Sequence, residues 1–446
     1  MTDSPDAPVA VDRPRRRLGD FQRLFTASTI SNLGDGMGQI AYPWLASAVT
    51  RNPLLIALIV VAQRLPWLVL SLPAGVITDR VDRRRLIVRM DLARGAITAV
   101  VAVGVMVGID SLPDASEVTE AGSTSIGLYL LVVFATLLLG CAEVLRDNAA
   151  QTLLPSIVET ENLERANGRL WAAEATANQF AGPPLGSLLL GLSFALPFVV
   201  DAVTFLVAGA LIATIGGTFR PVAEAETERR PWREDLREGI TWLRGNRVLW
   251  PMALVLGAMN GTDALAGATL VIFAQEVLDA GPFLFAVIGT GGAIGAIVGG
   301  WFVPNLSKRF GGGTVLAVAV AGLMVIPFAI GFAGAWPVVL VGFALTAMFG
   351  TAWNVVTVSL RQSVIPDRLL GRVNSVYRFL AWGSIPIGAA IGGVVVALLD
   401  GPLDREAALR APWIISGIVH IALLVVVLRR LSTAALNSIR SPEPQD

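Results

Sequence analysis

Long apolar stretches, each followed by a short polar connection, repeat along almost the whole chain. A helix that crosses a lipid bilayer needs about 20 predominantly apolar residues, because each residue adds about 1.5 Å along the helix axis. Twelve stretches satisfy this length, at residues 22–48, 53–78, 86–108, 126–147, 167–191, 195–218, 249–275, 283–304, 314–334, 336–362, 373–398 and 412–430. The pattern predicts an all-α integral membrane protein with twelve transmembrane helices.

The charged residues of the connections alternate in sign from one side of the predicted membrane to the other. The connection at 79–94 contains six arginines, whereas residues 109–125 include four acidic residues and no basic one. Cytoplasmic loops of membrane proteins carry an excess of Lys and Arg. We therefore expect a multi-pass protein of the cell membrane (inner or plasma membrane), with residues 79–94 and both termini in the cytoplasm.

The composition excludes several classes of protein. Of the 446 residues 54% are hydrophobic and only 15% are charged, whereas soluble proteins have about 25% charged residues. The single Cys141 cannot form an internal disulfide, and the single His420 leaves little room for zinc sites or for histidine-based catalytic triads. A phosphate-binding Gly-x4-Gly-Lys-Ser/Thr loop is also missing. We expect no catalytic residues, no metal and no cofactor.

Several short motifs occur twice, in the same order. Asn32-Leu33-Gly34-Asp35 and Asn260-Gly261-Thr262-Asp263 each lie about a dozen residues into an apolar stretch. Two further motifs repeat downstream: Gln151-Thr-Leu-Leu-Pro155 with Gln362-Ser-Val-Ile-Pro366, and Pro184-Leu185-Gly186 with Pro386-Ile387-Gly388. Repeats of the same membrane orientation are typical of transporters built from two parallel halves, which bind substrate near the midplane between them.

The repeat predicts two bundles of six helices joined by one polar segment. The expected parts are a cytoplasmic basic N-terminal segment (1–21), an N-terminal six-helix bundle (22–218), a cytoplasmic amphipathic linker (219–248), a C-terminal six-helix bundle (249–430) and a cytoplasmic tail (431–446). The linker contains apolar residues at helical spacing among Arg and Glu, so it is expected to form an amphipathic helix at the inner membrane surface.

Asp35 is the strongest candidate for a functional residue. A carboxylate in hydrocarbon costs at least about 2.5 to 3.5 kcal/mol, so an acid inside a membrane helix usually faces a polar cavity. Arg64 lies at a similar depth on the next helix, and an acid beside an arginine can couple proton binding to substrate binding. A fixed ion pair between two helices is the simpler alternative. The expected proton-coupling or substrate cavity contains Asn32, Asp35, Arg64, Asn260 and Asp263.

A second group of charges, Glu143, Arg146 and Asp147, ends the fourth stretch. The spacing places Glu143 on one helix face with both followers, which allows an ion pair within the helix. We expect a structural role for this group, close to the membrane interface where charge is tolerated.

The connection Gly75-Val-Ile-Thr-Asp79-Arg80-Val-Asp82-Arg83-Arg84 resembles the signature loop of the major facilitator superfamily, Gly-x-Leu-x-Asp-Arg-x-Gly-Arg-Arg/Lys. Ile77 replaces the leucine and Asp82 replaces the second glycine. Together with the Ser-Asn-Leu-Gly-Asp35 run and the Gly371-Arg-Val and Pro386-Ile-Gly runs, this variant is similar to the drug:proton antiporter-3 branch, which contains macrolide efflux pumps and enterobactin exporters. The resemblance covers the full length of the chain.

The resemblance implies that Asp79 and the arginines of its loop hold the cytoplasmic side closed when the transporter faces outward. The positive N-terminal end of the eleventh helix would favour the Asp79 carboxylate. The expected cytoplasmic gate consists of Asp79, Arg80, Arg83, Arg84, Glu174 and Arg378, with Arg378 as a further partner of Asp79 and Glu174 as a partner of the Lys308–Arg309 pair. The alternative is that the arginines only set the topology.

The fifth stretch contains Gly182-Pro183-Pro184-Leu185-Gly186, which is similar to the Gly-Pro-x-x-Gly-Gly motif of superfamily antiporters. Ser187 stands in place of the final glycine. Proline removes a backbone hydrogen bond and glycine allows close helix approach, so we expect a bend at Gly182, Pro183, Pro184 and Gly186. Ordinary packing of small residues is the alternative interpretation.

These features together predict a secondary active transporter that uses the proton gradient to export a hydrophobic or amphipathic small molecule by alternating access. The alternatives are a nutrient or metabolite symporter or facilitator, a membrane sensor that does not transport, and a membrane-embedded enzyme. The expected partners are a small-molecule substrate, protons and the lipid bilayer, with no nucleic acid, and we expect a monomer.

Overall fold

The computed structural model describes residues 18–78, 80–108, 112–113, 125–220 and 232–440, and these residues are almost entirely helical. The first part of the chain forms α1 (Leu18–Val49), α2 (Pro53–Thr78), α3 (Arg83–Val107), α4 (Ile126–Ile157), η3 (Thr160–Asn162), α5 (Leu163–Glu174), η4 (Ala175–Ala181), α6 (Gly182–Leu192) and α7 (Leu196–Ala213). The second part forms α8 (Trp232–Gly245), α9 (Leu249–Gly267), α10 (Leu270–Glu276), α11 (Pro282–Phe310), α12 (Gly312–Gly331), α13 (Trp336–Val364), α14 (Asp367–Leu399), α15 (Arg405–Arg430) and α16 (Thr433–Arg440).

The predicted membrane-spanning character is confirmed for most of the chain. Within the described residues, nine helices are long and apolar enough to cross a membrane, or up to ten if α8 and α9 are counted as one broken span. The other predicted spans fall on α1, on the run α5–η4–α6 and on α9, where charges or breaks interrupt the apolar sequence. The all-α membrane class is therefore established, and the exact number of twelve spans stays a prediction.

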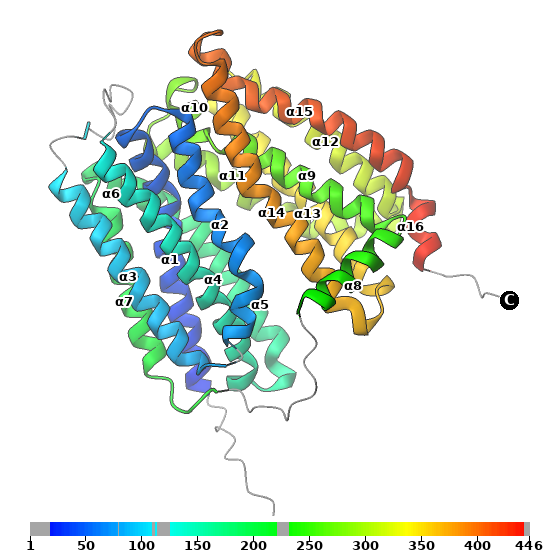
Figure 1. Cartoon of the computed structure of the whole chain (residues 1–446), viewed down its shortest axis with the longest axis horizontal. Helices are drawn as coiled ribbons and strands as arrows, with labels where there is room; N and C mark the ends of the chain where they lie inside the picture. Colours follow the sequence, from blue (N-terminus) through cyan, green and yellow to red (C-terminus); the bar gives the residue numbers. More distant parts are fainter. Residues whose placement is uncertain (1–17, 79, 109–111, 114–124, 221–231, 441–446) are drawn as a thin grey trace, which may run out of the picture.

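The helices form two groups, α1–α7 and α9–α15, which lie beside each other in Figure 1. We call the end of the molecule where α1 begins and α7 ends the proximal end, and the opposite end, where α1 ends, the distal end. The helices α2 and α14 pack against each other across the boundary between the groups, and α8 packs on α14. Contact between the groups is thus concentrated on a few helices.

The hydrophobic cores differ between the two ends. At the distal end a single cluster contains residues from both groups, such as Trp44 and Leu45 of α1 together with Phe273 of α10 and Phe285 of α11. The Trp44 and Phe285 rings lie 5.6 Å apart, centroid to centroid. At the proximal end each group has its own separate cluster. The two groups are therefore fused at the distal end and individually packed at the proximal end.

Corresponding helices of the two groups cross at glycines. A Cβ atom at Gly36 of α1 would lie only 2.9 Å from the Gly182 Cα of α6, and one at Gly388 of α14 would overlap the backbone of Gly261 in α9. Glycine permits such close approach because it has no side chain. These crossings bring α6 and α14 onto the helices that contain Asp35 and Asp263.

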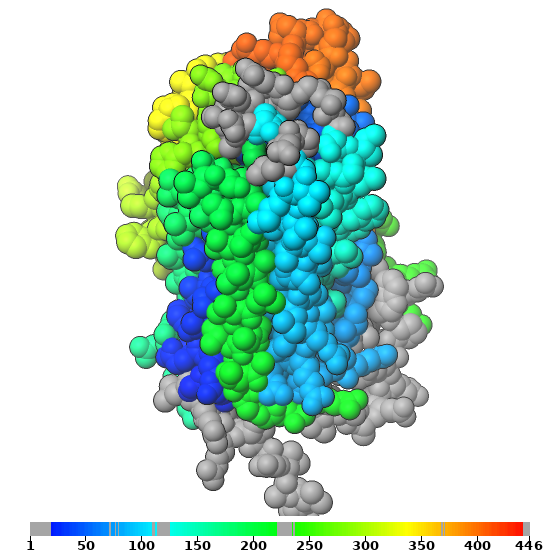
Figure 2. Space-filling view, turned by 90° about the vertical axis from the view of Figure 1, so that its left-hand side faces the viewer, coloured from blue at the N-terminus to red at the C-terminus, as the bar shows by residue number. Residues whose placement is uncertain are grey.

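Helices α3 and α7 lie side by side and cover the outer face of the first group, as Figure 2 shows. Their outward side chains are apolar, and Val100, Val103, Val203 and Val207 are all exposed. An apolar outer face suits contact with lipid chains. The charged residues of α3 and α7 that are described next are instead buried inside the group.

Candidate functional site

A cluster of buried charges occupies the interior of the first helix group. Its members, which we call the charge cluster, are Asp35 of α1, Asp91 and Arg94 of α3, Arg146 and Asp147 of α4, and Asp201 of α7. The Arg94 side chain is only 3% exposed and forms an ion pair with Asp35, whose side chain is 29% exposed. Burial of a charge is costly unless it is paired, so the arginines hold the cluster together.

Arg94 is the central cation of the charge cluster. Its Nη1 lies 3.9 Å from Asp91 Oδ1 and donates a hydrogen bond of 3.2 Å to Ser31 Oγ. Its guanidinium group lies 3.9 Å from the centroid of the Phe205 ring on α7, a cation–π arrangement. Arg94 therefore connects α1, α3 and α7 at one point.

The expected pairing of Asp35 with Arg64 is wrong, because the ion partner of Asp35 is Arg94. Arg64 is exposed on α2, and α2 packs mainly against α4 and α14 rather than against α1. Helices that follow one another in sequence are thus not the ones that lie together here. The depth of Asp35 could be read from the sequence, but its partner could not.

The ion pair expected between Glu143 and Arg146 is also not what the structure shows. Arg146 Nε lies 3.5 Å from Asp91 Oδ1 on α3, and its Nη1 lies 3.3 Å from Asp147 Oδ1. Its Nη2 donates a hydrogen bond of 3.3 Å to Ser28 Oγ on α1. Arg146 therefore links three helices and neutralises the fully buried Asp91 instead of bracing its own helix.

A small polar cavity borders the charge cluster. Its walls include Asp35, Tyr42, Arg94, Glu143 and Asp201, and its volume is about 50 Å³. One water molecule requires roughly 10 to 15 Å³ of such space and several polar partners, so the cavity can hold a few waters. Binding sites for drug-sized molecules measure roughly 300 to 1,000 Å³. The cavity thus suits water and protons rather than a large substrate.

The sequence analysis missed Asp91 and Asp201. Both lie in apolar runs that form membrane-spanning helices, and both are almost completely buried, at 0% and 3% exposure. The signal was present in the sequence, because an acid in the run Phe198-Val-Val-Asp201-Ala-Val is as unusual as Asp35.

The candidate residues of the second half do not join a comparable cluster. Asn260 Nδ2 donates a hydrogen bond of 2.8 Å to the Ala381 carbonyl oxygen of α14, and Asn32 Nδ2 donates one of 2.8 Å to the Ser28 carbonyl oxygen of its own helix. Asp263 is exposed, and within the described part of the chain it forms no ion pair. Asp35 and Asp263 therefore occupy repeated positions with different surroundings.

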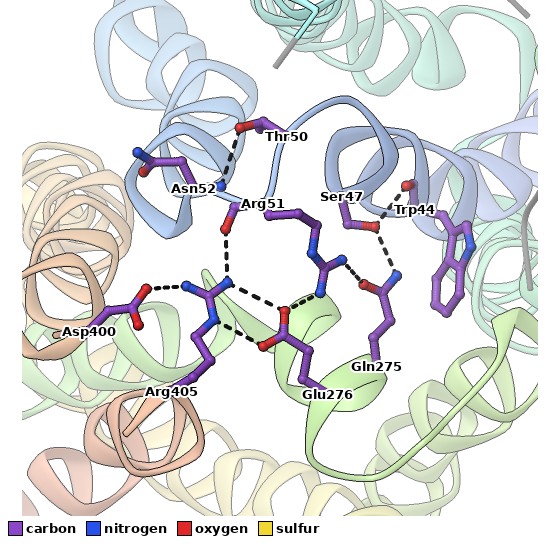
Figure 3. A network of polar contacts seen from close by, with 9 residues as sticks. All are labelled: Trp44, Ser47, Thr50, Arg51, Asn52, Gln275, Glu276, Asp400 and Arg405. Carbon is purple, nitrogen blue, oxygen red and sulfur yellow. Dashed lines mark hydrogen bonds and ion pairs between the residues drawn. The ribbon is translucent and has the colours of Figure 1, made fainter. Parts of the chain in front are cut away.

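The distal ends of the two groups are joined by a polar network, drawn in Figure 3. Arg51, in the turn between α1 and α2, forms an ion pair with Glu276 of α10 and donates a hydrogen bond of 2.5 Å to Gln275 Oε1. Gln275 Nε2 donates one of 2.8 Å to Ser47 Oγ on α1. Arg405 of α15 completes this distal network. All five residues bind a partner in the opposite group directly.

Arg405 holds both sides of the distal network. Its Nε donates a hydrogen bond of 2.9 Å to Glu276 Oε2, its Nη2 donates one of 2.8 Å to the Arg51 carbonyl oxygen, and it also pairs with Asp400. Charge-assisted hydrogen bonds of this kind are stronger than neutral ones. The network therefore reinforces the shared hydrophobic core beneath it.

The chain was compared with known proteins. The sequence profile of a family described as transmembrane secretion effector, a branch of the major facilitator superfamily, matches residues 14–445. The chain belongs to this family. The Multidrug efflux pump Tap of Mycolicibacterium fortuitum is 25% identical over 94% of this chain and 98% of that protein. The Enterobactin exporter EntS of Shigella boydii is 25% identical, over 92% of both chains.

Solved structures share the fold. A crystal structure of the nucleoside transporter NupG has a TM-score of 0.65 with 11% identity, covering 92% of this chain and 99% of that one. A bacterial homologue of the iron transporter ferroportin in an inward-facing state has a TM-score of 0.68 with 16% identity, covering 92% and 98%. The major facilitator fold is therefore established, and the family members are transporters rather than enzymes.

Two of the gate residues implied by the superfamily signature bond inside the first helix group. Arg83 Nη1 donates a hydrogen bond of 3.0 Å to the Thr152 carbonyl oxygen, and Arg84 donates one to the Ile215 carbonyl oxygen, both inside the first group. The remaining members of the expected gate, Arg80, Glu174 and Arg378, are exposed, and Asp79 lies outside the described residues. The gate as a whole therefore stays a prediction.

The antiporter-like motif begins immediately after an irregular turn. The seven residues of η4, Ala175–Ala181, form a π-helical segment that runs into Gly182 and Pro183. Pro184 follows, and a Cβ atom at Gly186 would lie 2.8 Å from the Met37 Cα of α1. Inserted π turns and prolines are common causes of helix irregularity. The π turn and the close approach of Gly186 to α1 thus lie beside the expected bend, and the bend itself stays a prediction.

Proposed function

We propose that this member of the transmembrane secretion effector family is a proton-coupled exporter of a hydrophobic or amphipathic small molecule, which works by alternating access. The observation that carries the proposal is the ion pair between Asp35 and Arg94, buried in membrane-spanning helices beside a polar cavity. Ionisable groups inside a membrane mark ion or substrate pathways. The relatives named for efflux of drugs and of enterobactin support export as the direction.

Alternating access fits the difference between the two ends of the molecule. The arginines of residues 80–94 favour the proximal end as the cytoplasmic one. The distal network and the shared core then close the external side, while the proximal ends of the two groups stay separate. We assign this conformation to the state open to the cytoplasm, from which an exporter takes up its cargo.

The cargo would bind between the two groups, which correspond to bundles of residues 22–218 and 249–430 joined by the linker. The cavity at the charge cluster is too small for such a molecule. Trp67 of α2 and Trp382 of α14 face each other across the boundary, with ring centroids 5.3 Å apart. Aromatic rings of this kind suit an amphipathic cargo, so both bundles would contribute to its binding.

The proposal is tested with purified protein in liposomes, in which efflux of dyes and drugs is followed under an imposed pH gradient. We expect flux that depends on the gradient in the wild type and its loss in Asp35→Asn. A Glu161→Gln variant, which also replaces an acid by its amide but at an exposed position outside the charge cluster and the expected gate, serves as the matched control. Gradient-driven uptake instead of efflux would favour a symporter, and flux indifferent to the gradient would contradict proton coupling.

A further inference from the structure

Asp201 differs from the other acids of the charge cluster in having no cation of its own. The other three are paired with arginines: Asp35 with Arg94, and both Asp91 and Asp147 with Arg146. In the described part of the chain no ion pair includes Asp201. Its carboxyl oxygen Oδ1 instead lies 3.4 Å from the Thr204 hydroxyl, one turn along the same helix.

The Asp201 carboxyl group lies directly against the backbone of α1. A Cβ atom at Gly34 would overlap Asp201 Oδ1 and Thr204 Oγ1, and one at Gly38 would lie 3.9 Å from Asp201 Oδ2. Gly34 and Gly38 are one helical turn apart, so they leave a groove on α1 beside Asp35. The Asp201 carboxyl group therefore fills a space that exists because Gly34 lacks a side chain, and Gly38 lies in ordinary contact distance one turn further on.

The titratable groups that face Asp201 come from α1, α3 and α4. Asp35 and Tyr42 of α1, Arg94 of α3 and Glu143 of α4 line the same small cavity as Asp201. The sequence of α6, which also packs on α7, contains no titratable residue. Among the described residues that line this cavity, Arg94 is thus the only arginine or lysine, and it is engaged by Asp35.

We propose that Asp201 carries the exchanged proton and competes with Asp35 for Arg94. This inference rests on the proposed proton-coupled transport and adds the residue that holds the proton. An unpaired carboxylate at 3% exposure is unfavourable, so Asp201 keeps its proton while Arg94 is bound to Asp35. The partly exposed Asp35 can be hydrated when it releases Arg94.

The exchange requires one proton and one change of ion pair. When cargo draws Asp35 away from Arg94, the guanidinium group turns to Asp201. The O–H bond of Asp201 then breaks, the proton passes to water in the cavity, and the carboxylate pairs with Arg94. Reprotonation of Asp201 from the other side of the membrane restores the Asp35–Arg94 pair and completes the cycle.

Infrared spectroscopy tests the position of the proton without any cargo. The carbonyl stretch of a protonated carboxyl group is measured at neutral pH for the purified full-length protein in lipid. We expect such a band in the wild type and its loss in Asp201→Asn. In Asp35→Asn the band should also weaken, because Arg94 is released to Asp201. The Glu143→Gln variant, which removes another acid of the cavity without an ion pair, should keep it.

A band that survives in Asp201→Asn but disappears in Glu143→Gln would overturn the proposal and place the proton on Glu143. A band unchanged in Asp35→Asn would contradict the competition for Arg94. If Asp201→Asn does not fold, Asp201→Glu and Gly34→Ala replace it. Asp201→Glu should keep the band. Gly34→Ala should shift it, because the added methyl group occupies the space of the Asp201 carboxyl group.

Transport of ethidium in liposomes separates this proposal from the proposed function. Asp201→Asn should exchange ethidium at equal pH but should lose efflux driven by a pH gradient, a split that simple misfolding would not produce. Gradient-driven efflux at the wild-type rate in Asp201→Asn would overturn the assignment. If the wild type itself shows no coupling to the gradient, the proposed function fails, whereas the infrared result still decides where the proton lies.

Discussion

The two halves of the molecule repeat the same order of helices, but within the described residues only the first half contains a buried charge cluster. In the first half α3 supplies Asp91 and Arg94 and α4 supplies Arg146, whereas α12 consists entirely of uncharged residues and α13 contains the single charge Arg361. The repeated acid shows the same contrast, because Asp35 pairs with Arg94 and Asp263 is exposed. A repeated backbone therefore does not imply repeated chemistry.

This difference in buried charge indicates that the two halves have separate roles. A cluster of four acids and two arginines that lie close together can exist in alternative pairings, which is the property that a coupling site needs. The second half contacts the first half through the distal network and through the packing of α14 on α2. We therefore expect substitutions of buried charges to matter far more in the first half than in the second.

Removal of Arg94, the central cation of the charge cluster, should cause the largest loss of stability. Arg94→Ala leaves the partly exposed Asp35 without its partner and the buried Asp91 with only Arg146. Loss of one partner from a buried ion pair costs about 3 to 5 kcal/mol. Arg361→Ala is the matched change in the second half, where the arginine lies over the Tyr377 ring and bonds Asn374 at 3.2 Å. Arg361→Ala should lower the free energy of unfolding by about 1 kcal/mol. Thermal unfolding of the purified variants measures both, and equal losses would contradict the contrast between the halves.

The repeated acids provide the direct functional comparison. Asp35→Asn should abolish gradient-driven transport, because it removes the carboxylate that holds Arg94. Asp263→Asn should keep most of the wild-type rate, since no ion pair of the described residues depends on it. Initial rates in liposomes, normalised to the amount of inserted protein, measure both variants. The reverse order of effects would move the coupling site into the second half.

Weakening of the distal network should shift the balance between conformations. Glu276→Gln removes the charge that Arg51 and Arg405 share, and hydrogen bonds to charged groups contribute about 1.5 to 3 kcal/mol. About 1.4 kcal/mol corresponds to a tenfold change in population. Spin labels on cysteines introduced at Asn52 and Asp279, with Cys141→Ser, should report a larger population with separated distal ends.

Glu406→Gln is the control for the distal network. Glu406 pairs with Arg410 one turn along the same helix, so this ion pair does not connect the two helix groups. Its loss should leave the spin-label distances unchanged. A shift in Glu406→Gln as large as that in Glu276→Gln would mean that the distal charges act through general electrostatics rather than through this network.

Much of the fold follows from local features of the sequence. The length of each apolar stretch predicts a spanning helix, and the repeats at Asp35 and Asp263 and at Pro184 and Pro386 predict related halves. Such signals depend on neighbouring residues in the chain. The helical structure and the superfamily were therefore accessible before any coordinates.

The partners of the charged residues could not be predicted in the same way, because they depend on which helices lie together. Arg64 follows Asp35 on the next helix in sequence, yet α1 packs against α6 and α7, and Arg94 reaches Asp35 from α3. The distal network was missed for the same reason. Arg51 lies in the turn after α1, Glu276 ends α10 and Arg405 begins α15. They are far apart in the chain, so each looks like an ordinary charge near the end of a span.

The smallest effect is expected for His420, the single histidine of the chain. It is buried in α15, and its Nδ1 lies 2.8 Å from the Ser416 carbonyl oxygen of the same helix. His420→Asn should cost about 1 kcal/mol or less, the contribution of one hydrogen bond. If the first half alone contains the coupling site, the pH profile of transport by His420→Asn should coincide with that of the wild type, below neutral pH as well as above it. A displaced profile would show that a titrating group in the second half takes part, and the contrast between the halves would then apply to structure but not to coupling.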